Sequence, residues 1–119
     1  DVCSSDLDGF FIFGSPTAAL WASRFHKAPF LSLVFVNQRY TTGTAGLRAS
    51  YPEGYAAKQG NYLGGTFEPA PDFVKLAEAV NGYGENVKEA AEVGPALERG
   101  LQAVRNGSPA VIAVHVPGI

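Results

Sequence analysis

This chain of 119 residues contains no methionine and only one cysteine, Cys3. A single cysteine cannot form an internal disulfide, and we expect a reducing, cytoplasmic location. There is no excess of basic residues either, because the formal net charge is -2, which argues against a nucleic-acid surface. No apolar run reaches the roughly 18 residues that a membrane-spanning helix needs, so we expect no membrane partner.

Familiar catalytic arrangements are also missing. Cysteine, histidine and acidic residues do not occur at zinc-site spacings, and no serine stands in a Gly-x-Ser-x-Gly turn. His26 follows a predicted helix, where a C-terminal imidazole is favourable. His115 lies in a predicted strand, and it either faces a pocket at the strand's end or is an ordinary, satisfied strand residue. We therefore expect no catalytic residue in this chain.

The order of hydrophobic patterns predicts an α/β fold. With 46% apolar residues, the chain can form one globular domain with a modest core. Helical and strand-like segments alternate, which favours a mostly parallel sheet flanked by helices. The expected elements are a helix within 10–25, a strand at 30–36, an irregular segment at 38–70, a helix at 72–81, a short strand at 83–87, a helix at 89–105 and a strand at 109–116.

An aromatic stripe marks the first helix. Its apolar positions recur at steps of three and four, which predicts one buried helical face. Proline suits the first turn of a helix, so the regular helix is expected to begin at Pro16 with Ser15 as its cap. We assign Trp21 and the cluster of Phe10, Phe11 and Phe13 to the core. The stripe consists of Phe10, Phe13, Thr17, Trp21 and Phe25.

The segment Phe30–Val36 is almost continuously apolar, which is typical of a central strand buried on both faces. By contrast, Asp1–Leu7 is polar and predicts neither a helix nor a strand. We interpret Asp1–Leu7 as atypical and foreign: a misread, a fusion scar or a truncation junction. Residues 8–119 then form the domain proper, as a fragment truncated on its N-terminal side.

Two polar sites can meet at one edge of this sheet. Asp8-Gly9 opens the aromatic run, and Asn37 closes the buried strand. Mg²⁺ prefers oxygen ligands, and the Asp8 carboxylate, the Asn37 amide oxygen and a main-chain carbonyl just past Asn37, that of Arg39, can supply three. Backbone N–H groups at a glycine turn before a helix attract phosphate, and Gly9 permits a close approach. Each site taken alone is an ordinary turn.

These segments resemble the C-terminal cofactor domain of thiamine diphosphate enzymes, closest to the acetolactate synthase and benzoylformate decarboxylase group. The family motif reads Gly-Asp-Gly followed, after a spacer, by Asn-Asn; here Leu7 and Val36 replace its first glycine and first asparagine. The resemblance runs from Asp8 to Val116. It rests on Asp8–Gly14 with Pro16–Trp21, on Pro29–Tyr40, on Asp72–Ala79 with Gly82–Gly84, and on Pro95–Arg99 with Pro109–Ile112.

The resemblance implies a role for each site residue. Asp8, the Asn37 amide and the Arg39 carbonyl bind Mg²⁺, and the main-chain N–H groups of Gly9 and Phe10 hold the diphosphate. Tyr40 and Thr41 lie beside the diphosphate or the substrate. The thiazolium ring of the cofactor supplies the chemistry, since it attacks a 2-keto acid and takes up electrons as CO₂ leaves.

The same resemblance implies partners. In the family, the glutamate that activates the aminopyrimidine belongs to a separate N-terminal pyrimidine-binding domain, and a central domain lies between the two. No residue here matches that glutamate, because Glu53, Glu68 and Glu78 are interpreted as surface carboxylates. We therefore expect the chain alone to be inactive, and the intact protein to be a homodimer or homotetramer.

Two other hypotheses stay open. Because Leu7 and Val36 depart from the motif, the chain can instead be a non-catalytic α/β module that binds phosphate or a nucleotide or serves only in assembly. It can also be an unfolded or aggregating remnant, because a missing first strand would leave a sheet edge and an apolar face uncovered.

Overall fold

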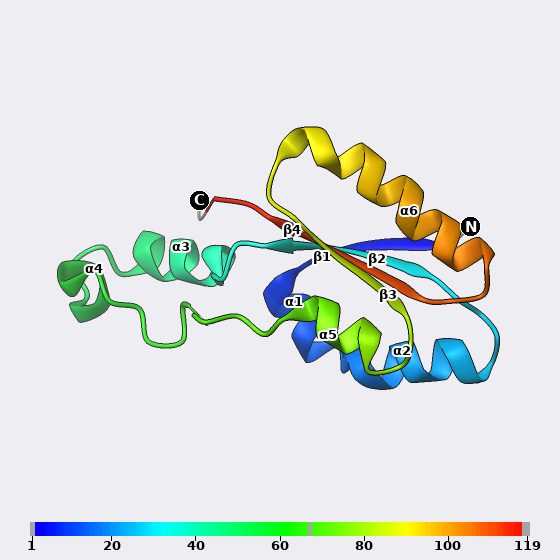
Figure 1. The fold of residues 1–119 in the computed structure, drawn as a ribbon. Coiled ribbons are helices and arrows are strands. Elements are labelled where there is room, and N and C mark those ends of the chain that lie inside the picture. Colours follow the sequence, from blue (N-terminus) through cyan, green and yellow to red (C-terminus); the bar gives the residue numbers. More distant parts are fainter. Residues whose placement is uncertain (1, 67, 118–119) are drawn as a thin grey trace.

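The computed structural model describes residues 2–66 and 68–117, and its centre is a four-stranded parallel sheet of order β1-β2-β4-β3. Helix α6 covers one face of the sheet, and α1, α2 and α5 cover the other (Figure 1). The predicted α/β fold with flanking helices is confirmed. The sheet and its helices are β1 (Cys3–Leu7), α1 (Asp8–Phe13), α2 (Pro16–Phe25), β2 (Leu31–Val36), α5 (Phe73–Glu78), β3 (Tyr83–Val87), the 3-10 helix η1 (Ala90–Glu92), α6 (Val93–Arg105) and β4 (Ala110–His115).

Strand β1 corrects the prediction that Asp1–Leu7 is neither helix nor strand. Residues Cys3–Leu7 pair in parallel with Leu31–Phe35 of β2. The strand lies at an edge of the sheet and its side chains are mostly exposed, so it needs no apolar alternation, and the hydrophobic pattern could not reveal it. The first strand is therefore present, which removes the premise of the unfolded-remnant hypothesis. The foreign origin of residues 1–7 stays a prediction.

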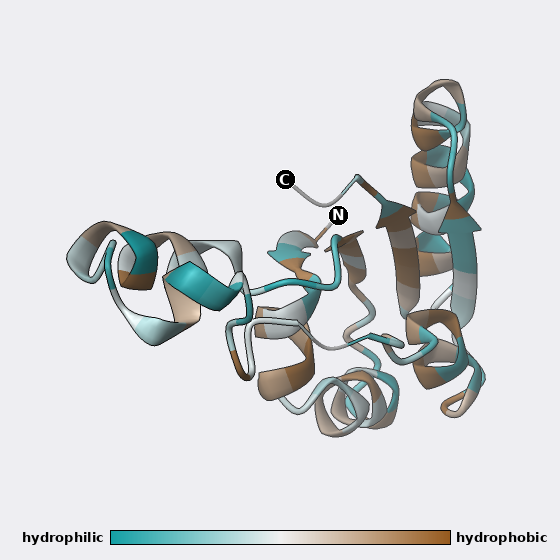
Figure 2. Ribbon diagram, turned by 90° about the vertical axis from the view of Figure 1, so that its left-hand side faces the viewer, coloured by the Kyte–Doolittle hydropathy of each residue, from teal (hydrophilic) through white to brown (hydrophobic). Residues whose placement is uncertain are grey.

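The core has two parts, one on each face of the sheet. Under α1, α2 and α5, the side chains of Phe11, Leu20, Val34 and Phe73 form one cluster, in which the Phe11 and Phe73 rings meet edge to face at 5.8 Å. Under α6, a second cluster includes Leu31, Ala96, Val104 and Ile112. Strands β2 and β4 are buried on both faces, as predicted for central strands, and Figure 2 shows apolar strands in the middle of the sheet.

The aromatic stripe of the first helical segment lies on the surface, where its four aromatic side chains are 58 to 78% exposed. The assignment of Phe10, Phe13 and Trp21 to the core is therefore wrong, whereas that of Phe11 is confirmed, because Phe11 is buried. The chain forms two helices rather than one, because Ser15, at a left-handed φ of 53°, separates α1 from α2. Because of this break, the apolar positions of α1 and α2 do not continue along one helical face. The exposed aromatic face consists of Phe10, Phe13, Trp21 and Phe25.

Helix boundaries agree with several sequence signals. Helix α2 begins at Pro16 as predicted, although the Ser15 side chain makes no capping hydrogen bond. Asp72 caps α5, since its carboxylate accepts a hydrogen bond from the Val74 N–H at 3.1 Å. The chain turns with a left-handed φ of 55° at Asn81, just after this helix. Helix α6 ends at Arg105, as predicted, and Gly107 follows with a left-handed φ of 86°.

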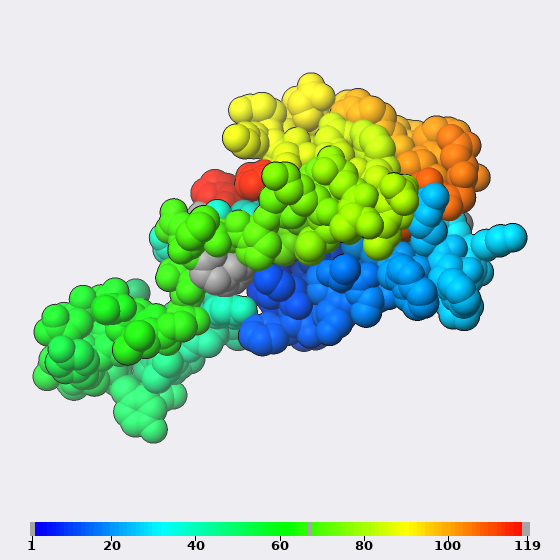
Figure 3. All heavy atoms as spheres, turned by 60° about the horizontal axis from the view of Figure 1, so that its bottom comes forward, coloured from blue at the N-terminus to red at the C-terminus, as the bar shows by residue number. Residues whose placement is uncertain are grey.

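The segment predicted as irregular, 38–70, contains a helical arm. Helix α3 (Thr41–Ser50) is ten residues long and is followed by the short helix α4 (Tyr55–Gln59). Glycine-rich sequence concealed α3, because Gly43 and Gly46 weaken its helical propensity. The arm projects away from the sheet, and no residue of either helix is buried (Figure 3). None of the helices in the described part of the chain is long and apolar enough to cross a membrane.

Candidate functional site

The two predicted polar sites lie at the same edge of the sheet. Strands β1 and β2 are parallel neighbours, with Leu7 opposite Phe35, so their carboxyl ends lie side by side. Asp8 follows β1 directly as the first residue of α1, and Asn37 follows β2. Parallel α/β sheets commonly bind ligands at this edge. The fold thus brings the two halves of the predicted site together.

Asp8 is the centre of this site. Its side chain is fully buried, and each of its carboxylate oxygens accepts a backbone hydrogen bond. Oδ1 accepts from the N–H of Gly9 at 2.9 Å, and Oδ2 accepts from the N–H of Gln38 at 2.7 Å. The second bond joins the end of β1 to the turn after β2. Since a carboxylate offers about four acceptor positions, two remain for a cation.

Asn37 and Arg39 form the turn opposite Asp8. Asn37 is buried, and its Oδ1 accepts a hydrogen bond from the N–H of Arg39 at 3.1 Å. Gln38 between them has a left-handed φ of 57°, which reverses the chain sharply. The Arg39 side chain is exposed. The turn therefore keeps the Asn37 amide oxygen close to the backbone, with one acceptor position left for a second partner.

Gly9 has a packing role that the sequence did not show. A Cβ at this position would clash with the ring of Tyr40, so only glycine allows the ring to lie there. The Tyr40 ring also approaches Phe13, with ring centroids 6.2 Å apart. The Gly9 N–H donates to Asp8, as described above, rather than pointing outward. Phe10, the next predicted phosphate-binding position, has a 76% exposed side chain.

Two hollows border the predicted site residues. One, of about 220 Å³, has walls that include Gly9, Phe10, Arg39, Tyr40 and Thr41, five of the seven predicted cofactor-binding residues. The other, of about 270 Å³, is more polar and lies beyond the ends of β2 and β4. Its walls include Asn37, Gln38, Arg39 and His115. Six of the seven predicted residues therefore line these two hollows, whereas Asp8, which is fully buried, lines neither.

Two residues at this edge were not assigned from the sequence. Gln38 contributes only its N–H, and no side-chain pattern signals such a role. His115 does face a hollow, and its ring Nε2 lies 2.7 Å from Oδ1 of Asn86, so it is both satisfied and adjacent to the site. Register pairs the ends of β3 and β4, which places Asn86 near His115, but the sequence alone does not give that register.

The two departures from the family motif are accommodated in different ways. The Leu7 side chain is 51% exposed, so it does not crowd the turn before Asp8. Val36 is buried and belongs to the apolar core. Neither replacement removes an oxygen atom from the Asp8 and Asn37 arrangement.

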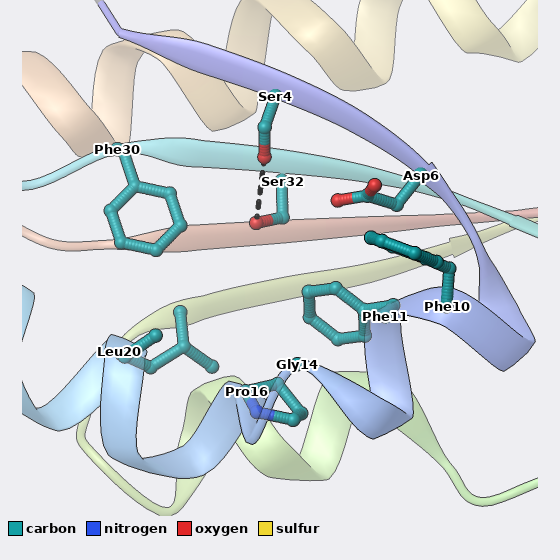
Figure 4. A pocket seen from close by; sticks show the side chains of 10 residues that line it. Ser4, Asp6, Phe10, Phe11, Gly14, Pro16, Leu20, Phe30 and Ser32 are labelled. Atoms are coloured by element: carbon teal, nitrogen blue, oxygen red, sulfur yellow. Dashed lines mark hydrogen bonds between the residues drawn. The ribbon is translucent and has the colours of Figure 1, made fainter.

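A further hollow, of about 190 Å³, lies between β1 and helices α1 and α2. Its walls are mostly apolar, with Phe10, Phe11, Leu20 and Phe30 around the hydroxyl pair of Ser4 and Ser32, whose oxygens are 3.5 Å apart (Figure 4). It opens beside the edge strand, and Asp6 is its one acidic lining residue, with no amide side chain such as Asn37 beside it. We therefore regard it as an uncovered part of the core rather than as a second polar site.

The donor set suits a hard divalent cation better than a soft one. Asp8 and Asn37 offer oxygen atoms, and Mg²⁺ takes one or two protein oxygens and completes its shell with phosphate and water. Among the described residues, no group of three or more histidine, cysteine and acidic side chains is placed to hold a metal. At this edge the described residues offer one carboxylate, that of Asp8, and one amide oxygen, that of Asn37.

The comparison with protein families agrees with this geometry. Residues 6–114 match the family described as thiamine pyrophosphate enzyme, C-terminal TPP binding domain. The matched range includes β1 from Asp6, both polar turns and most of β4. Because the match covers nearly the whole chain, this chain belongs to that family of thiamine pyrophosphate-binding domains.

Proposed function

We propose that this domain holds the diphosphate end of thiamine pyrophosphate through Mg²⁺. The protein ligands are the Asp8 carboxylate, the Asn37 amide oxygen and the main-chain carbonyl of Arg39. The observation that carries the proposal is the 2.7 Å hydrogen bond from the Gln38 N–H to Asp8, which ties together the two halves of the motif. The remaining acceptor positions on both side chains leave capacity for a cation.

The other residues of the site orient the cofactor. The N–H groups of Gly9 and Phe10 lie in the first turn of α1, where donors lack intrahelical partners. The Gly9 N–H donates to the Asp8 carboxylate, so it can turn to the diphosphate only after Mg²⁺ replaces it as a partner of that carboxylate. We therefore expect cofactor binding to require Mg²⁺. Tyr40 and Thr41 border the same hollow and exclude water from one side of it.

The reaction class we propose is decarboxylation or carboligation of 2-keto acids, as in the acetolactate synthase and benzoylformate decarboxylase group. The support is the resemblance of Pro16–Trp21 and Pro29–Tyr40 to that group. When bound, the thiazolium ring supplies the electron sink for loss of CO₂. The residues of this chain bind and orient the cofactor and do not themselves transfer a proton.

We further propose that the chain alone is inactive and that a separate pyrimidine-binding domain, a central domain and a second subunit complete the enzyme in the cytoplasm. Of the three exposed glutamates, Glu53 and Glu78 line neither hollow at this edge, and Glu68 lines the polar hollow beside Asn37 but not the hollow at Gly9. The exposed aromatic face supports a covering partner, since large exposed apolar patches mark interaction sites.

Calorimetric titration with thiamine pyrophosphate tests the proposal. We expect binding with Mg²⁺ and none with a chelator, loss of binding in Asp8→Ala, and weakening of about tenfold or more in Asn37→Ala. Asp6→Ala is the matched control, because Asp6 is a half-buried carboxylate two residues away, and it should bind like the unchanged chain. Undiminished binding by Asp8→Ala would remove the site assignment.

A second candidate is a non-catalytic phosphate- or nucleotide-binding module. Leu7 and Val36 favour it, together with the Tyr40 ring that lies against Gly9. This alternative predicts that ADP competes with thiamine pyrophosphate at similar affinity. Selective, Mg²⁺-dependent binding of thiamine pyrophosphate contradicts it.

A further inference from the structure

Helix α3 and the chain that returns from the arm enclose a hollow of about 530 Å³, which we name the arm pocket. One wall comes from Arg39 and the helix Thr41–Ser50, and the other from residues 60–66. The arm pocket shares Arg39 and Thr41 with the smaller hollow at Gly9. A ligand in the arm pocket therefore lies next to the predicted cofactor edge without occupying it.

Specific contacts hold this pocket in shape. The N–H of Tyr40 donates to the carbonyl of Gly65 at 2.9 Å, and Arg39 forms an antiparallel bridge with Thr66. Gly65 is buried, and a Cβ there would stand 2.6 Å from Cγ2 of Thr44. The returning chain thus lies against α3 in one position that requires glycine. The arm pocket is therefore an open hollow whose two walls are held together by these contacts.

The walls of the arm pocket are positively charged. Arg39 and Arg48 both line it, together with the polar side chains of Thr41, Thr44 and Asn61, and none of its described lining residues is acidic. In the part of the chain that the structure describes, neither arginine forms an ion pair. Guanidinium groups match carboxylate and phosphate oxygens through paired hydrogen bonds. The chemistry of the pocket is therefore that of an anion receptor.

We propose that the arm pocket binds the anionic group, a carboxylate or a phosphate, of a small organic ligand through Arg39 and Arg48. Thr41, Thr44 and Asn61 border the same space and favour a polar ligand over an apolar one. The site is distinct from the Mg²⁺ and diphosphate site, because Arg48 and residues 60–66 take no part in that one. It does not depend on the proposed function.

The test is a titration of the whole chain with three probes: succinate, inorganic phosphate and neutral succinamide. At about 0.15 M ionic strength, long-range attraction is screened beyond about 8 Å, so contact binding dominates. We expect succinate or phosphate to bind and succinamide not to bind. The tighter of the two anions identifies the group that the site takes.

Variants of single cations distinguish a specific site at Arg48 from non-specific electrostatic attraction of anions to the arm. Arg48→Ala should weaken the bound anion about tenfold or more, the effect of one charge-assisted hydrogen-bond pair. Arg48→Lys should restore only part of it, since lysine lacks the planar fork. Lys58→Ala, which removes a cation from the same arm outside the pocket, should change binding less than twofold. Because Arg48 is exposed on α3, none of these changes is expected to unfold the chain.

The proposal is overturned if neither anion binds, if succinamide binds equally well, or if Lys58→Ala weakens binding as much as Arg48→Ala. Asp8→Ala separates this site from the cofactor site. It should abolish binding of thiamine pyrophosphate and leave anion binding within twofold. Failure of thiamine pyrophosphate to bind the unchanged chain would affect the proposed function alone.

Discussion

At the scale of single residues, Asp8 joins structure and binding. Its buried carboxylate accepts two backbone N–H bonds, one from its own turn and one from the turn after β2. The sequence predicted that Asp8 and Asn37 meet at one edge of the sheet, although it predicted a strand only before Asn37 and none before Asp8. It did not predict the partner of Asp8, because a backbone N–H carries no side-chain signature. Gly9 was predicted to let a phosphate approach closely. In the structure, the Tyr40 ring occupies the space that a Cβ at Gly9 would fill.

The first prediction concerns stability without any ligand. Asp8→Ala leaves the N–H groups of Gly9 and Gln38 without their acceptor, and it should lower the free energy of unfolding by about 2 kcal/mol or more. Urea denaturation of the two proteins measures the difference. Asp6→Ala, the matched control, should change it by less than about 0.5 kcal/mol. Equal stability of Asp8→Ala and the unchanged chain would show that the two hydrogen bonds are not formed in solution.

At the scale of elements, periodicity predicted most of the sheet and helices but missed strand β1 and the two arm helices, α3 and α4. Strands β2 and β4 and helices α5 and α6 bury apolar residues in regular patterns, whereas the short strand β3 buries only Val87. Strand β1 is polar and lies at an edge, and α3 buries no residue, so neither leaves a hydrophobic period. The aromatic stripe led to a wrong core assignment for a related reason. A regular period shows that one helical face is apolar, but it does not show that another part of the same chain packs on that face.

Two glycines with opposite surroundings test the packing of elements. Gly84 of β3 lies against α5, and a Cβ there would stand 2.9 Å from the Val74 carbonyl oxygen, so Gly84→Ala should destabilise the fold by about 1 to 3 kcal/mol. Gly94, in the first turn of α6, has nothing within 4 Å of such a Cβ. Gly94→Ala should stabilise by about 0.5 to 1 kcal/mol through helix propensity. Thermal unfolding measures the melting temperatures of both variants. A higher melting temperature for Gly84→Ala than for Gly94→Ala would contradict this packing.

A salt bridge between α6 and β3 gives a pH-dependent prediction. Arg99 donates to both carboxylate oxygens of Glu85, and this hydrogen bonding lowers the pKa of Glu85 below its usual value of 4.5. A lowered carboxylate pKa contributes stability that is present above the usual value and is lost as the pH falls through the folded value. Arg99→Met should therefore reduce the melting temperature at pH 7 more than at pH 2. A pH-independent difference would show that the loss is one of packing.

At the scale of the whole molecule, several large apolar side chains are exposed on the surface instead of packed in the core. The exposed aromatic face of α1 and α2 lies outside the two core clusters. The arm projects from the rest of the molecule (Figure 3). Trp21 stacks on Phe25, with ring centroids 5.1 Å apart, and is still 58% exposed. These surfaces are where we expect the partner domains and the second subunit to pack.

The single tryptophan reports on that face directly. In the isolated chain, Trp21 emission should be red-shifted and readily quenched by acrylamide, because its side chain lies in solvent. Phe25→Ser should reduce self-association, measured by sedimentation, without lowering the melting temperature by more than a few degrees. A blue-shifted, protected Trp21 in a monomeric sample would contradict the exposed position of this face.

The central claim is that the turns at Asp8 and Asn37 form one Mg²⁺-dependent site for thiamine pyrophosphate. Its most direct test is residue-resolved NMR of the backbone amides during titration with thiamine pyrophosphate, with Mg²⁺ and then with a chelator. The account predicts that the amides of Gly9, Gln38 and Arg39 shift together, only when Mg²⁺ is present, and not in Asp8→Ala. Shifts that are independent of Mg²⁺, or that leave these three amides unchanged, would contradict it.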